Sequence, residues 1–181
     1  VKTPEEKEIE QTEYFFGYKA HVSLNSQAEL ITSLEVTSGE AWDGHHFCSL
    51  VAHDQQQKLP IDTYTADKGY DDGNNHFYLE LKGLHSAIHL KGNRIGKKDN
   101  HKEIWVKLVK TPQYQQGLQE RYKIERKFGE GKQSHGLGRC RYVGKIKFAI
   151  QAFFIAIVLN LKRMVKLLTG VGFKTPVAAT A

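Results

Sequence analysis

Alternating and helix-spaced apolar positions divide the chain into short predicted elements. Residues 14–24 and 30–36 are rich in aromatic and β-branched side chains and partly alternate, with a polar turn between them. Two such runs on either side of a turn predict an antiparallel hairpin. In residues 44–57, apolar side chains recur at i, i+3 and i+4, which predicts a helix.

The rest of the chain predicts two further strands and three further helices. Short apolar runs at residues 61–66 and 86–90 predict the strands. Helices are expected around Phe77 to Leu81, over residues 116–128 and over residues 146–168, the last long and strongly apolar. This order of strands and helices indicates an α/β or α+β domain built on a mixed sheet flanked by helices.

Length and composition fit one globular domain. The chain has 181 residues, of which 40% are hydrophobic and 25% are charged, and these values exclude disordered and collagen-like classes. Residues 1–13 are polar and acid-rich, which is typical of a linker or disordered arm. We expect a domain over residues 14–170 and a flexible tail over residues 171–181.

Positive charge is concentrated in the last third of the chain. Residues 121–166 hold twelve Lys and Arg against two acids, a net charge of +10, whereas the remaining chain carries −4 within a total of +6. This asymmetry favours a one-sided surface for nucleic acid or for an anionic membrane. The alternative is a solvated basic face without a partner.

Cysteine usage and hydropathy indicate a reducing compartment and no bilayer span. Cys48 and Cys140 form no CxxC pair, so neither a zinc site nor a disulfide framework is predicted. The longest uninterrupted apolar run, residues 152–159, has eight residues, whereas a transmembrane helix needs about 20. The stripe within the last helix is expected to be core; it comprises Phe148, Phe153, Phe154, Ile157 and Leu161.

Asp67 is the first candidate for chemistry. It directly follows a predicted strand of buried character, and open α/β sheets place ligands and catalysis at the carboxyl ends of their strands. The alternative is a turn-forming Asp before a glycine.

A second candidate group lies on the predicted helix around Glu125. At about 100° per residue, Arg121, Glu125 and Lys132 share one helical face if the helix continues that far. Gly129 and Gly131 weaken its last turn by about 1 kcal/mol each relative to alanine. The alternative is a surface Arg–Glu pair worth about 0.3 to 0.5 kcal/mol.

Together the two segments fit an RNase H-like nuclease site. Such a site brings carboxylates from separate elements together to hold two Mg²⁺ about 3.5 to 4 Å apart. Asp67 and Glu125 are plausible catalytic residues and metal ligands. Arg121 and Lys132 would supply contacts to phosphates.

Several motifs resemble the DDE domain of bacterial insertion-sequence transposases, of the type with a Tyr-Arg-Glu-Lys signature. The resemblance runs in order from Phe16 to Arg163 and covers most of the chain. The matching segments are Gly17-Tyr18-Lys19-Ala20-His21, Val36-Thr37-Ser38-Gly39 with Asp43, Ala66-Asp67-Lys68-Gly69-Tyr70, Arg121 to Gly129 with Lys132, Gly136, Arg139, Arg141-Tyr142, Gly144, and Asn160-Leu161-Lys162-Arg163.

The resemblance implies roles for individual residues. Asp67 corresponds to the second catalytic acid and Glu125 to the third, both as metal ligands. The DNA-binding positions are Arg121, Lys132, Arg139 and Arg141. Mg²⁺, or Mn²⁺ in its place, is the implied cofactor.

The chain departs from the family pattern at two points. Leu118 stands where the signature tyrosine is expected, and no Asp precedes Asp43. The first catalytic Asp and its strand are therefore expected to be missing, as in the C-terminal part of a longer transposase or in a degenerate copy.

The implied function is Mg²⁺-dependent hydrolysis and strand transfer at insertion-sequence ends. The implied setting is the bacterial cytoplasm, close to the nucleoid, with a homodimer on transposon-end and target DNA and no membrane partner. Two alternatives stay open. One is a catalytically inactive DNA-binding remnant, and the other is a general nuclease of the same fold.

Overall fold

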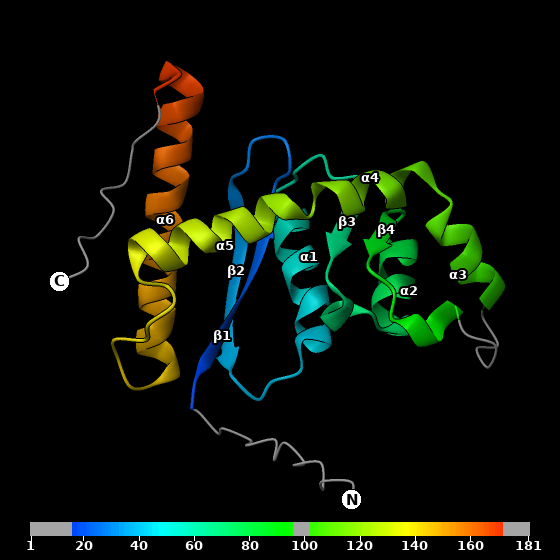
Figure 1. The fold of residues 1–181 in the computed structure, drawn as a ribbon, viewed down its shortest axis with the longest axis horizontal. Helices are drawn as coiled ribbons and strands as arrows, with labels where there is room; N and C mark the ends of the chain where they lie inside the picture. The colour runs from blue at the N-terminus through cyan, green and yellow to red at the C-terminus, as the bar shows by residue number, and fades with distance from the viewer. Residues whose placement is uncertain (1–15, 96–101, 172–181) are drawn as a thin grey trace, which may run out of the picture.

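The computed structural model describes residues 16–95 and 102–171 and has α/β architecture (Figure 1). The predicted arm and most of the predicted tail lie outside these residues. The strands are β1 (Tyr18–Leu24), β2 (Ile31–Ser38), β3 (Thr63–Ala66) and β4 (His85–Ile88). The α-helices are α1 (Phe47–Gln56), α2 (Gly73–Leu81), α3 (Lys102–Val109), α4 (Pro112–Glu120), α5 (Tyr122–His135) and α6 (Lys145–Thr169). Short 3₁₀ turns are η1 (Asp43–His46), η2 (Lys68–Tyr70) and η3 (Gly92–Ile95).

The predicted hairpin is confirmed. β1 and β2 pair antiparallel from Tyr18 opposite Ser38 to Leu24 opposite Ile31. The Asn25 side chain accepts hydrogen bonds from the backbone amides of Gln27 and Ala28, which fixes the turn between them. α6 packs across this hairpin and α5 packs against α6, so the three elements form one half of the molecule (Figure 1).

The second half is built on the parallel pair β3 and β4. Their register runs from Thr63 opposite His85 to Ala66 opposite Ile88, and α2 supplies the connection that parallel strands require. α2 and α4 both pack on this pair. A Cβ atom on Gly117 of α4 would lie 2.4 Å from the Cβ atom of Ala87, so only glycine allows α4 to lie this close to the sheet.

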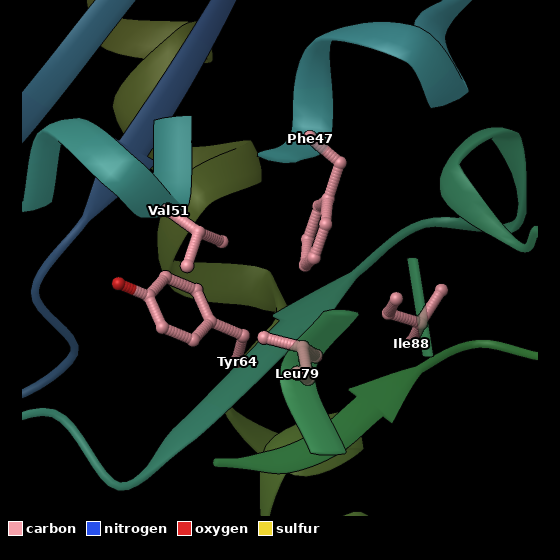
Figure 2. Close-up of a cluster of buried hydrophobic side chains, with 5 residues drawn as sticks. All are labelled: Phe47, Val51, Tyr64, Leu79 and Ile88. Carbon is pink, nitrogen blue, oxygen red and sulfur yellow. The ribbon is translucent and has the colours of Figure 1, made fainter. Parts of the chain in front are cut away.

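The main core lies between α1, α2 and the parallel pair. Figure 2 shows its five buried members, which are Phe47, Val51, Tyr64, Leu79 and Ile88. The apolar positions that predict α1 are all buried. The helical spacing of residues 44–57 therefore identifies a true core face.

A buried carboxylate on α1 joins the two halves. Asp54 is fully buried and accepts hydrogen bonds from Ser23 on β1 at 2.5 Å, Ser33 on β2 at 2.6 Å and Tyr64 on β3 at 3.3 Å. Burying a charge is tolerated only when donors compensate it, and three hydroxyls do so here. α1 is thus anchored to strands of both sheets.

The prediction of a single mixed sheet needs correction, although α/β architecture is confirmed. The four described strands form two separate sheets, β1 with β2 and β3 with β4. β1 and β3 both line a cavity of about 1020 Å³, which we call the central cleft, and α1, α4 and α5 also contribute to its lining. The sheet is divided because, among the described residues, no strand pairs with the edges of β1 and β3 that line the cleft.

The long helical regions differ from the prediction in two places. Residues 116–128 fall in two helices, α4 and α5, which meet at Arg121, and α3 was not predicted. The predicted last helix is confirmed as α6. Its stripe is only partly core, however, because Phe148 is buried while Phe153, Phe154, Ile157 and Leu161 are exposed. No described segment covers that side of α6.

α6 also has the length and composition of a membrane-crossing helix. The eight-residue apolar run understates this property, because a longer stretch of α6 contains only two charged residues. A core helix of a soluble protein can have the same length and composition, so these properties alone do not make α6 a membrane span. The absence of a membrane partner stays a prediction.

Candidate functional site

Asp67 and His89 lie side by side at one end of the parallel sheet. Asp67 follows β3 directly and His89 follows β4 directly, and the His89 amide donates to the Ala66 carbonyl at 2.9 Å. The Asp67 carboxylate accepts from the Lys68 amide at 2.7 Å, which caps the turn η2. The carboxyl ends of both strands therefore present a polar side chain at the same edge.

Arg121, at the junction of α4 and α5, connects this edge to Glu125. Its Nη1 donates to Asp67 Oδ1 at 3.1 Å and to His89 Nδ1 at 3.1 Å. Its Nη2 and Nε donate to Glu125 Oε1 at 2.8 and 3.2 Å. One guanidinium thus holds both predicted acids together.

The electrostatics of this group keep Arg121 charged and His89 neutral. The hydrogen bond to Glu125, together with the nearby Asp67, raises the pKa of Arg121. Burial, followed by the positive charges of Lys68 and Arg121, lowers the pKa of His89. Since a guanidinium only donates, the unprotonated Nδ1 of His89 is the acceptor.

The predicted acids are open to solvent. The side chains of Asp67 and Glu125 are 65% and 60% exposed, whereas Arg121 is 29% exposed. Ion pairs at this exposure contribute little to stability. Both carboxylates therefore remain accessible to a ligand that enters the central cleft.

Lys132 shares the face of α5 that carries Glu125. The helix continues to His135, so the predicted weakening at its two glycines does not end it. Gly131 instead allows a close approach, since a Cβ atom there would lie 3.1 Å from Leu137 Cδ2. Arg121, Glu125 and Lys132 all line the central cleft, as the helical spacing predicts.

Arg139 and Arg141 lie apart from the cleft, in the loop between α5 and α6. Both are exposed, and neither lines the central cleft. The side chain of Gln151 fixes the loop backbone: Nε2 donates to the carbonyls of Gly136 and Arg139, and Oε1 accepts from the Arg141 amide. The four predicted DNA-binding residues therefore occupy two places on the surface.

A further ion pair lines the cleft, and the sequence did not assign it to the site. Lys19 on β1 forms an ion pair with Asp43 at 2.9 Å, and both line the cleft with Asp67 and Glu125. His21 and Tyr70 also line the cleft, and His21 Nδ1 and the Tyr70 hydroxyl are 2.8 Å apart, which joins β1 to the turn after Asp67. The cleft is thus bordered by charged residues from both halves.

Leu118 has a structural role at the position of the signature tyrosine. It packs, partly buried, against the cluster formed by Ala87, Leu90, Trp105 and Tyr114. Tyr114 is buried, and its hydroxyl accepts from the Leu90 amide at 3.3 Å. This position on α4 therefore faces the sheet and not the cleft.

His89 is the residue in contact with Arg121 that sequence reasoning missed. It falls within the predicted strand at residues 86–90, where it reads as one polar position among apolar neighbours. The missing information was the parallel pairing of β3 and β4, which places the residues after each strand together. Its place near the carboxyl end of that predicted strand is the only sequence signal.

The described residues offer carboxylates but no complete metal cage. Among residues 16–95 and 102–171 there is no group of three or more His, Cys, Asp or Glu side chains placed to hold an ion. Mg²⁺ is usually held by one or two carboxylates with water and substrate phosphates completing its shell. Asp67 and Glu125 fit that donor set.

Comparison with known proteins identifies relatives of the chain. Residues 1–161 match the family of the transposase DDE domain. The transposase for insertion sequence element IS1106 of Neisseria meningitidis serogroup B is 28% identical over 149 residues, covering 82% of this chain and 47% of that protein. The chain therefore spans about half the length of this curated relative. No solved structure matches.

Proposed function

Because the chain belongs to the transposase DDE domain family, we propose that its central cleft is part of the active site of a DNA transposase. The reaction is Mg²⁺-dependent hydrolysis and strand transfer at insertion-sequence ends. One observation carries this proposal: the guanidinium of Arg121 contacts both Asp67 and Glu125, acids that are 58 positions apart in the chain. If Asp67 only formed a turn and Glu125 only formed a surface pair with Arg121, nothing would explain why Arg121 contacts both acids.

Asp67 and Glu125 are the proposed metal ligands. Both offer exposed carboxylate oxygens at the mouth of one cleft, and Mn²⁺ accepts the same donors. When bound, the ion supplies charge neutralisation and activation of an attacking oxygen. The guanidinium of Arg121 compensates the negative charges of both carboxylates and keeps them close together.

The basic residues are proposed to bind the DNA backbone. Lys132 lies on the same face of α5 as Glu125 and offers a point charge to a phosphate, while Arg121 offers a planar fork. Arg139 and Arg141 extend the positive surface beyond the cleft. We propose that the first pair positions the reacting strand and that the second pair contacts flanking DNA.

The cleft also supports an RNase H-like sheet whose first strand lies outside the described residues. Among the strands that the structure describes, β1 and β3 each have a partner on one side only, and both line the cleft between α1 and α5. An extended segment placed there would join the two sheets into one mixed sheet. We propose that this segment brings the first catalytic acid, so the activity of the chain depends on it.

We further propose the bacterial cytoplasm, close to the nucleoid, as the site of action. The partners are transposon-end and target DNA, bound by a homodimer. Contacts to phosphates make the affinity for DNA fall as the salt concentration rises, and this fall can be measured directly.

The proposal is tested by measuring metal and DNA binding separately. Titration with Mn²⁺, followed by water proton relaxation, should show binding to the unmodified chain and a loss of at least about tenfold in Asp67→Asn and Glu125→Gln, since Mg²⁺-type sites depend on one or two carboxylates. Glu80→Gln, an exposed acid on α2, should bind Mn²⁺ normally. Glu125→Gln should leave the affinity for duplex DNA nearly intact.

Arg121→Ala provides the contrasting variant in the same experiment. It should weaken DNA binding and lower the salt slope by about one, because one phosphate contact is lost. Salt-dependent DNA binding without any Mn²⁺ binding would favour the inactive remnant. An equal loss of DNA and metal binding in Glu125→Gln would contradict the ligand role.

A further inference from the structure

α6 presents a continuous apolar face on the side away from the rest of the fold. Ten large apolar side chains on this helix are between 39% and 85% exposed. They are Ile146, Ile150, Phe153, Phe154, Ile157, Val158, Leu161, Met164, Leu167 and Leu168. Monomeric proteins rarely expose apolar patches larger than a few hundred Å².

Six of these side chains follow the spacing of a helix-pairing seam. Ile150, Phe154, Ile157, Leu161, Met164 and Leu168 alternate in steps of four and three residues, as a and d positions of a heptad do. The buried residues of α6, such as Phe148, Ala152 and Leu159, lie on the opposite side of the helix at about 100° per residue. We call these six residues the α6 seam.

The area of this face matches that of a protein interface. Aromatic side chains offer about 150 to 250 Å² each when buried, so ten side chains at the observed exposures present an apolar surface on the order of 1,000 Å². A standard interface buries about 800 Å² per partner. The seam with its flanking residues is therefore large enough for a stable pair.

Polar contacts between α6 and the rest of the fold argue against insertion into a bilayer. The Asn160 side chain exchanges two hydrogen bonds of 2.8 Å with the backbone of Ile31. Arg163 donates to the Ala28 carbonyl at 2.7 Å, and Lys162 forms an ion pair with Glu130 at 2.7 Å. A spanning helix would have to break these contacts or bury them in hydrocarbon.

The charge pattern on the exposed face of α6 favours a second protein chain over an anionic membrane as its partner. At about 100° per residue, Lys147 is the one charged position of α6 that falls beside the seam, whereas helices that lie on anionic membranes carry many cations along their polar face. In a parallel pair of helices, Lys147 would face its own copy. In an antiparallel pair it would lie near the carboxyl end of the other helix, where the helix dipole favours a cation.

We propose that two copies of this chain associate through antiparallel α6 seams. The symmetric alignment places Ile150 against Leu168, Phe154 against Met164 and Ile157 against Leu161 of the second copy. The contact of Phe154 with Met164 pairs an aromatic ring with a thioether, which is favourable. The interface deepens the proposed homodimer, but it depends on neither DNA nor metal and is tested without them.

Sedimentation equilibrium of the full chain, without DNA, tests the association. The unmodified chain should approach twice its mass of 20.6 kDa as concentration rises. The double variant Ile157→Glu, Leu161→Glu should raise the dissociation constant by at least about 100-fold, since two buried apolar contacts are lost. Both positions are exposed in the single copy, so circular dichroism should show an unchanged fold.

Phe77→Glu is the matched control, because Phe77 is a similarly exposed apolar residue on α2. It should leave the dimer intact. A chain that stays monomeric at all concentrations, or an equal effect of Phe77→Glu, would overturn the proposal. So would transfer of the monomeric chain to vesicles of neutral phosphatidylcholine.

Disulfide trapping tests the orientation in a Cys140→Ser background. The double variant Phe154→Cys, Met164→Cys should form a covalent dimer under mild oxidation. Phe154→Cys alone should not, because the two copies of residue 154 would lie about 15 Å apart along the helices, beyond disulfide reach. Efficient trapping by Phe154→Cys alone would overturn the antiparallel arrangement.

Discussion

At the residue scale, the site shows what local spacing can and cannot predict. The step of four residues between Arg121 and Glu125 predicts their contact, and the structure confirms it. The contact of Arg121 with Asp67 bridges 54 positions, and no periodicity encodes such a distance. The two acids were placed together by comparison with an RNase H-like nuclease site and by the resemblance to a family, and neither pointed to His89.

Buried histidines make the stability of this chain sensitive to pH. His76 is buried, with Asp71 3.1 Å from its Nε2 atom and Ser86 2.8 Å from its Nδ1 atom. Burial lowers the pKa of His76 despite the opposing effect of Asp71, and burial likewise lowers the pKa of His21. The unfolded chain therefore takes up protons before the folded chain as pH falls through about 6.5.

The free energy of unfolding should consequently decrease as pH is lowered from about 7.5 to 5.5. Urea denaturation at several pH values measures this slope, to which each histidine adds at most about 1.4 kcal/mol per pH unit. His76→Asn should flatten the slope, whereas His53→Asn, at an exposed position of α1, should not. A slope that rises towards acid pH would contradict the assignment.

At the scale of elements, local sequence patterns predicted where helices and strands lie better than they predicted which elements pair or pack together. The hairpin, α1, α2 and α6 each have a pattern confined to a few turns or one alternating run, and all four are confirmed. The break between α4 and α5 was not predicted, because helical spacing continues across Arg121. The division of the sheet also depends on contacts between distant segments, which periodicity does not report.

Two helical glycines should respond to alanine in opposite directions. Gly117→Ala should lower the free energy of unfolding by about 1 to 3 kcal/mol, because its Cβ atom would collide with Ala87 and force α4 off the sheet. A Cβ atom on Gly129 of α5 would meet nothing within 4 Å. Gly129→Ala should therefore raise the free energy of unfolding by about 0.5 to 1 kcal/mol, because alanine has the higher helix propensity. Urea denaturation of both variants checks this, and a shift of the same sign in both would contradict the packing of α4.

At the scale of the whole molecule, the central cleft lies between the two halves. Asp54 on α1 and the contact of His21 with Tyr70 join them directly. α4 and α5 run across both halves along one side (Figure 1). Among the described residues, the edges of β1 and β3 that line the cleft have no strand partner, so we expect the amides that point into the cleft to be less protected than the paired ones.

Hydrogen exchange should reveal this edge directly. The Gly39 amide donates to the Gly17 carbonyl, and bonded pairs alternate along an antiparallel ladder. The amides of Lys19 and His21 should thus bond to β2 and exchange slowly, while those of Ala20 and Val22 should exchange fast. Nuclear magnetic resonance measures the exchange rate of each amide. Strong protection of Ala20 and Val22 would mean that the edge of β1 is covered in solution.

The division into two sheets also has a consequence for folding. Each sheet joins strands that are neighbours in sequence, β1 to β2 through a short turn and β3 to β4 through α2. Loop closure costs little entropy over such short separations, and low contact order favours fast formation. We therefore expect each half to gain its own pairing early and the docking of the halves around Asp54 to be the slow step, because its three hydroxyl partners come from both.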